Sequence, residues 1–132
     1  MTLVVDASLV VAALIDVEAP GQWARALLAR ESVAAPQLLP AETANALRGA
    51  VISSRLTEAG ASRAYADLLQ LPVVLYDYDE VADRAWELRN TITIYDAWYV
   101  ALAEALEVPL ATLDLRLARA PGARCAFLTP PA

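Results

Sequence analysis

The fold class is decided by a short stretch near the start of the chain, LVVDAS at residues 3–8. Its first three residues form an apolar run of the kind found in strands that are buried on both faces of a sheet. The run ends at Asp6, and an apolar helical pattern follows over residues 8–15. A buried strand that passes directly into a helix predicts an α/β fold.

The alternation of strands and helices continues along the chain. Further strands are predicted at residues 32–35, 73–75, 110–112 and 125–128. Helices are predicted at residues 22–30, 40–54, 57–71, 79–89, 95–106 and 115–120, and residues 18–21 are predicted as a turn. This order indicates a three-layer αβα fold with a mostly parallel sheet of four or five strands. The 132 residues fit a single domain, residues 1–132.

The composition excludes several classes of protein. Hydrophobic residues make up 58% of the chain, which rules out intrinsic disorder. No apolar run approaches the ~20 residues of a membrane-spanning helix, and no basic segment precedes a long apolar one as in a signal peptide. Cys125 is the only cysteine, so an internal disulfide and a thiolate metal site are excluded. We therefore expect a cytoplasmic protein that does not enter membranes.

Two absent residue types narrow the chemistry further. The chain contains no histidine, and its ten basic residues are all arginine. Histidine-based triads, His-ligated zinc and Schiff-base chemistry on lysine are thereby excluded. The 16 acidic residues give a net charge of −6, which argues against a protein that coats nucleic acid by charge alone. The groups that remain available for chemistry are carboxylates, arginines, hydroxyls and a hard metal ion.

Four acidic residues stand where predicted strands pass into helices. Asp6 and Asp114 follow the strands at residues 3–5 and 110–112, and Asp96 and Glu42 lie in the first turns of predicted helices. Short connections place all four at the carboxyl edge of the sheet, where α/β proteins have their reactive crevice. Carboxylates that converge repel each other unless a cation lies between them, and Mg²⁺ and Mn²⁺ prefer such oxygen ligands. We expect Asp6 and Asp96 to face a solvent crevice rather than the core.

Each acid also has an ordinary structural explanation. Asp6, Asp96 and Asp114 are candidates for helix N-caps, and Glu42 is a candidate for an exposed helix residue. These explanations do not account for four acids at one sheet edge. Their conjunction favours a metal site.

Four blocks of sequence together cover nearly the whole chain and lie at residues 4–8 (VVDAS), 36–48 (PQLLPAETANALR), 95–103 (YDAWYVALA) and 110–117 (LATLDLRL). They resemble the PIN-domain family, and within it the VapC toxins of bacterial type II toxin–antitoxin pairs, and they occur in the family's order. The resemblance implies a metal-dependent endoribonuclease. Its acids correspond to Asp6, Glu42, Asp96 and Asp114.

Hydrolysis of a phosphodiester needs an activated water and charge stabilisation, which one or two Mg²⁺ ions supply, with Mn²⁺ as a substitute. We expect Asp6 and Asp96 to be direct ligands, Asp114 to bind directly or through water, and Glu42 to hold a second ion or orient the water. Supporting roles are predicted for five further residues. Ser8 and Thr112 would hydrogen-bond the acids, Asn45 would orient Glu42 or contact RNA, and Arg48 and Arg116 would clamp phosphates or simply be solvated.

The predicted partners are an RNA substrate, a VapB-like antitoxin and a second copy of the chain. The helices between residues 22 and 71 are more apolar than one face of the sheet requires. A partner surface is therefore a candidate role for Trp23, Leu27, Leu28 and Tyr65, and so is the ordinary core. We expect an arginine or lysine of the antitoxin to enter among the four acids.

Two other function classes stay open. One is a catalytically silent binding module with this fold. The other is a phosphotransferase of another α/β family. A receiver-type domain needs a lysine, which the chain lacks, and a haloacid-dehalogenase-like enzyme needs a second acid two residues after the first, where Ser8 stands.

Overall fold

The computed structural model describes residues 1–132 and contains one five-stranded sheet. The strand order is β3-β2-β1-β4-β5, and every pairing is parallel. The strands are β1 (Thr2–Val5), β2 (Ser32–Pro36), β3 (Val73–Tyr76), β4 (Leu110–Ala111) and β5 (Phe127–Leu128). The predicted parallel sheet is confirmed, with five strands.

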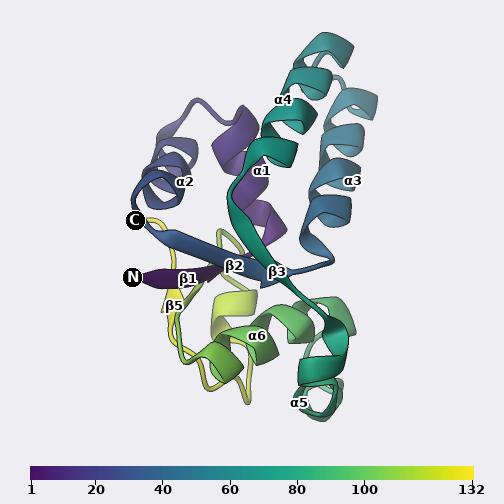
Figure 1. The fold of residues 1–132 in the computed structure, drawn as a ribbon. Coiled ribbons are helices and arrows are strands. Elements are labelled where there is room, and N and C mark those ends of the chain that lie inside the picture. The colour runs from purple at the N-terminus through teal and green to yellow at the C-terminus, as the bar shows by residue number, and fades with distance from the viewer.

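Helices cover both faces of the sheet (Figure 1). One face carries α1 (Ala7–Ile15), α2 (Ala19–Arg30), α3 (Leu39–Ile52) and α4 (Glu58–Gln70). The other face carries α5 (Ala82–Glu87) and α6 (Ile94–Leu106), and short 3-10 turns occur at η1 (Tyr78–Val81) and η2 (Leu117–Arg119). The three-layer αβα architecture is therefore confirmed. No helix in the structure combines the length and the apolar composition that crossing a bilayer requires.

Three helix boundaries differ from the sequence-based prediction. Helix α2 begins at Ala19 rather than after a turn, because proline is tolerated in the first turn of a helix. Gly21 lies against the end of α1, where an added Cβ would come within 1.8 Å of the Asp16 carbonyl oxygen. The predicted helix at 79–89 is split, because Val81 leaves helical geometry (φ −123°, ψ 10°). The predicted helix at 115–120 is reduced to η2.

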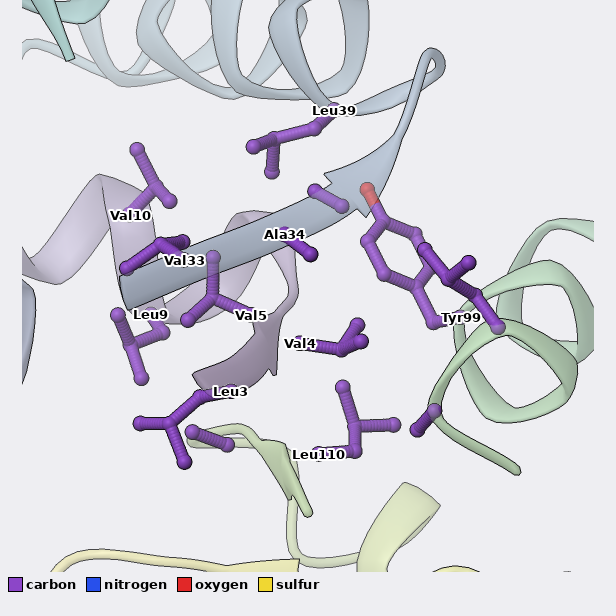
Figure 2. Close-up of a cluster of buried hydrophobic side chains, with 14 of the residues drawn as sticks. Leu3, Val4, Val5, Leu9, Val10, Val33, Ala34, Leu39, Tyr99 and Leu110 are labelled. Atoms are coloured by element: carbon purple, nitrogen blue, oxygen red, sulfur yellow. The ribbon is translucent and has the colours of Figure 1, made fainter. Parts of the chain in front are cut away.

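The core lies on both sides of β1, whose residues Leu3, Val4 and Val5 have no exposed surface (Figure 2). Leu27 is buried in this core, and Trp23 and Leu28 pack against it. Tyr65 alone of the four candidate partner residues is exposed. The prediction of a partner surface is therefore wrong for Leu27, which α2 turns toward the sheet.

The order of the strands creates a topological switch point between β1 and β4. The chain leaves β1 for β2 through helices on one face, whereas it reaches β4 through α5 and α6 on the opposite face. In open α/β sheets, ligands bind outside the carboxyl ends of strands at such a point. Asp6 follows β1 and Thr112 follows β4, so both residues flank it.

Candidate functional site

Asp6 lies at the centre of the switch point and is the N-cap of α1. Its Oδ1 accepts hydrogen bonds from the Leu9 N–H (3.1 Å) and the Ser8 hydroxyl (2.7 Å), and its Oδ2 accepts one from the Thr112 hydroxyl (2.5 Å). The side chain is buried, with 6% of its surface exposed. The expectation that Asp6 faces a solvent crevice is therefore wrong, because the Ser8 hydroxyl at the start of α1 and the Thr112 hydroxyl after β4 enclose it.

One lone pair of the Asp6 carboxylate accepts no hydrogen bond from the protein. The two bonds to Oδ1 occupy both lone pairs of that oxygen, whereas the single bond to Oδ2 leaves one lone pair. Burial raises the pKa of Asp6, the hydroxyl and N–H donors oppose that rise, and the charge of Asp114 adds to it. A nearby cation would favour the ionised form that the buried position disfavours.

The hydroxyls of Thr112 and Ser8 connect the segment after β4 to the start of α1. Thr112 Oγ1 donates to Asp6 and accepts the Asp114 N–H at 2.9 Å. Ser8 Oγ accepts the Leu113 N–H at 3.0 Å and lies 3.3 Å from Thr112 Oγ1. Thr112 therefore fixes the position of Asp6 and the backbone of Asp114 together.

Asp114 and Asp96 line the same cleft, which has a volume of about 720 Å³. Asp114 Oδ1 accepts the Arg116 and Leu117 N–H groups, at 2.9 and 3.2 Å. Asp96 lies in the first turn of α6, and the N-cap of that helix is Thr93. Partial burial and the charge of Asp114 raise the pKa of Asp96, and the Arg116 guanidinium, which lines the cleft as well, opposes that rise.

Glu42 reaches the site from α3, on the other face of the sheet. Its Oε1 accepts a hydrogen bond of 2.7 Å from the Tyr99 hydroxyl on α6. Figure 2 shows the Tyr99 ring extending from α6 with its hydroxyl directed toward the end of β2. Partial burial and the charges of Asp96 and Asp6 raise the pKa of Glu42, and the Tyr99 bond opposes that rise.

Sequence reasoning missed Tyr99 as a member of the site. The sequence did indicate that Tyr99 lies near the site, because Tyr99 follows Asp96 by three residues and so lies on the same side of the helix. The ring is 1% exposed, and such a tyrosine is easily taken for core. A buried tyrosine hydroxyl needs a partner, and here the partner is Glu42.

Two of the supporting residues predicted from the sequence lie apart from the acids. Asn45 is exposed on α3, and its side chain makes no hydrogen bond within the protein. Arg48 lines a separate groove of about 290 Å³ between α3 and α4, which Tyr65 also borders. Of the two predicted phosphate clamps, only Arg116 shares the cleft of Asp96 and Asp114.

The four carboxylates act on one another through space. The charge of Asp114 acts on Asp6 and on Asp96, and the charges of Asp6 and Asp96 act on Glu42. No three acidic side chains lie close enough to enclose a metal ion as they stand. The donor set nevertheless fits Mg²⁺, because this ion keeps several waters and is usually bound by only one or two carboxylates.

The raised pKa of Asp96 predicts how the stability of the protein changes with pH. A carboxyl whose pKa is higher in the folded state contributes stability below its ordinary value of 3.8 and loses that contribution as pH rises through the folded value. In EDTA, Asp96→Asn should therefore gain thermal stability over the wild type as pH rises from about 4 to 8. Calorimetry measures the melting temperature of both proteins at each pH. The prediction is contradicted if the advantage of Asp96→Asn in melting temperature shrinks as pH rises.

Comparisons with known proteins identify the family of the chain. A profile of the PIN domain matches residues 3–123. The chain is 46% identical over 126 residues to a Mycobacterium tuberculosis protein named ribonuclease VapC1, and the match covers 92% of each chain. It is 41% identical over 129 residues to ribonuclease VapC9 of the same species, with 98% of each chain covered.

A solved structure with appreciable sequence identity has the same fold. The crystal structure of PAE2754 from Pyrobaculum aerophilum matches with a TM-score of 0.67 and 32% identity, over 89% of this chain and 86% of that one. The predicted family resemblance is confirmed over nearly the whole chain. The chain belongs to the PIN-domain family and, within it, to the VapC proteins.

Proposed function

We propose that this protein is a Mg²⁺-dependent endoribonuclease and the toxin of a type II toxin–antitoxin pair, with Mn²⁺ able to replace Mg²⁺. The observation that supports the proposal is the position of the four acids: Asp6 follows β1, Asp96 and Asp114 line one cleft, and Glu42 on α3 is bound by Tyr99 of α6. The names of the relatives, ribonuclease VapC1 and ribonuclease VapC9, support the substrate class.

Each acid has a role that follows from its free oxygens. We assign Asp6, through Oδ2, and Asp96 as direct ligands, Asp114 as a ligand or the acceptor of a bound water, and Glu42 as the group that orients water or a second ion. A bound divalent cation supplies an activated water and stabilises charge on the phosphate. The protein supplies the positions, because Thr112 and Ser8 fix Asp6 and Tyr99 fixes Glu42.

Arg116 completes the proposed site from the protein side. It lines the cleft beside Asp96 and Asp114 and makes no ion pair within 4 Å. A guanidinium in this position binds a phosphate oxygen and offsets the repulsion between RNA and the carboxylates. Arg48 lies in the separate groove between α3 and α4 and therefore has no role in binding phosphate at this site.

The test of the proposed function is RNA cleavage by the purified protein. Labelled RNA should be cut internally in Mg²⁺ or Mn²⁺ and stay intact when EDTA is added. Equal cleavage with and without EDTA would contradict metal dependence. RNA binding without cleavage under every metal condition would favour the silent binding module.

Tyr99→Phe should weaken the binding of Mg²⁺ without unfolding the protein. The substitution keeps the buried ring but removes the only side-chain hydrogen bond to Glu42. Loss of such an outer partner typically costs about 10- to 100-fold in metal affinity or activity. The Mg²⁺ concentration for half-maximal cleavage measures the effect, and because the bond opposes the rise in the pKa of Glu42, a higher pH should restore part of the activity. An unchanged Mg²⁺ dependence would show that Tyr99 has no role in positioning Glu42.

We also propose that a VapB-like antitoxin binds this protein and places an arginine or lysine side chain among the four acids. The support is membership of the VapC proteins and the charge of the site, where carboxylates that repel one another would accept a cationic side chain. The exposed Tyr65 and the groove between α3 and α4 offer apolar surface to the same partner or to a second copy of the chain.

A further inference from the structure

The cleft beside the acids extends well beyond them. Its lining comes from two segments that lie against each other, residues 89–96 and residues 114–121. The Thr91 hydroxyl donates to the Pro121 carbonyl at 3.2 Å, which brings the start of one segment to the end of the other. Asp96 and Asp114 therefore lie toward one end of the cleft, and Arg89 and Arg119 lie toward the other.

The lining of this cleft carries more positive than negative side chains. It contains Arg89, Arg116 and Arg119, and its only acids are Asp96 and Asp114. None of the three arginines forms an ion pair within 4 Å, whereas Arg30 and Arg84 elsewhere on the surface pair with glutamates. In a chain with 16 acidic and 10 basic residues, a lining of three arginines and two acids is locally positive, which suits a polyanion.

An exposed aromatic side chain lies beside Arg89. Trp86 at the end of α5 is 58% exposed, whereas the two other tryptophans pack against the core. The Arg89 guanidinium lies 4.4 Å from the centre of the Trp86 ring and donates to the Trp86 carbonyl oxygen at 2.8 Å. The two side chains therefore form a fixed stack, which we call the Trp86–Arg89 platform.

We propose that the Trp86–Arg89 platform docks an unpaired nucleotide of the RNA strand that runs from the acids along the cleft. Aromatic rings and guanidinium planes are the groups on which proteins stack unpaired bases, and Arg119, which lines the same cleft as Arg89, supplies a phosphate contact. This inference rests on the proposed function. It adds a contact point for one unpaired base outside the group of four acids.

Tryptophan fluorescence and RNA binding test the platform directly. In EDTA, a labelled single-stranded oligoribonucleotide of mixed sequence should bind and quench tryptophan emission, because Trp86 is the exposed tryptophan. Trp86→Leu should weaken binding about tenfold and abolish most of the quenching, since it removes the stacking face. Trp86→Phe should abolish the quenching but keep most of the affinity. A blunt RNA duplex of the same sequence should bind more weakly than the single strand.

Charge variants test the path along the cleft. Arg89→Gln and Arg119→Gln should each lower the slope of log Kd against log salt by about 0.7, the value for one phosphate contact on a single strand. Arg63→Gln is the matched control, because Arg63 is exposed on α4, on the opposite face of the sheet, and should leave the slope unchanged. If the wild type cuts RNA while Trp86→Leu and Arg89→Gln bind and cut it normally, the platform is wrong and the proposed function stands. If the wild type neither binds nor cuts RNA, the platform and the proposed function are both wrong.

Discussion

Asp96→Asn should reduce RNA cleavage in Mg²⁺ by about a thousandfold or more, because a bound metal contributes several kcal/mol to stabilisation of the transition state. The substitution keeps the shape of the side chain and removes the charge that attracts the cation. Asp96 is partly exposed and lines the cleft, so the domain should stay folded. Initial rates of cleavage of a labelled RNA measure the effect.

The loss should be specific to the site acids. Asp67→Asn is the matched control, because Asp67 is exposed on α4 away from the cleft, and it should keep wild-type rates. Asp6→Asn should lose cleavage as Asp96→Asn does, although Asp6 is buried. A cleavage rate within tenfold of the wild type for Asp96→Asn would rule out a direct role in binding the metal.

Thr112→Val should both destabilise the protein and impair cleavage. Thr112 is fully buried, and its hydroxyl is the only donor to Asp6 Oδ2 and the acceptor of the Asp114 N–H. Losing a hydrogen bond to a charged group costs about 1.5–3 kcal/mol, and losing a partner of a metal ligand costs about 10- to 100-fold in activity. Urea unfolding and cleavage rates measure the two effects.

The structure provides a matched control for the loss of a buried hydroxyl. Thr43 is also fully buried, but its Oγ1 has no hydrogen-bond partner, so Thr43→Val should be neutral or stabilising. Thr112→Ser keeps the hydroxyl and should retain most of the activity. In a double-mutant cycle, Thr112→Val should cost less stability when Asp6 is already asparagine. Equal costs in both backgrounds would mean that Thr112 acts independently of Asp6.

The positions of the strands follow from local sequence, and so does the edge at which the acids gather. A buried apolar run next to a helix predicts β1, and the carboxyl ends of parallel strands share an edge whatever the details of packing. The helix at 79–89 could not be predicted to split, because the departure of Val81 from helical geometry has no local sequence signal. The start of α2 was obscured by Pro20 and Gly21, which usually mark a turn.

The environment of each acid depends on contacts between distant residues. Asp6 is buried because Thr112, 106 residues later in the chain, covers it. Glu42 is held by Tyr99 from the opposite face of the sheet, and no pattern within α3 reveals that bond. The Trp86–Arg89 platform was likewise hidden, since an aromatic residue in a helix is more often core than surface.

The central place of β1 also governs how the molecule is made. Val4 pairs with Ala34 on one side and with Leu110 on the other, so β1 waits for β4, which is synthesised after β2 and β3. Pairings between residues so far apart in sequence form slowly, because closing the long loop costs entropy before any contact offsets it. Asp6 therefore acquires its Thr112 partner only after β4 has been synthesised and docked. Under the proposed function, the nascent chain stays inactive on the ribosome until β4 has emerged and has docked against β1.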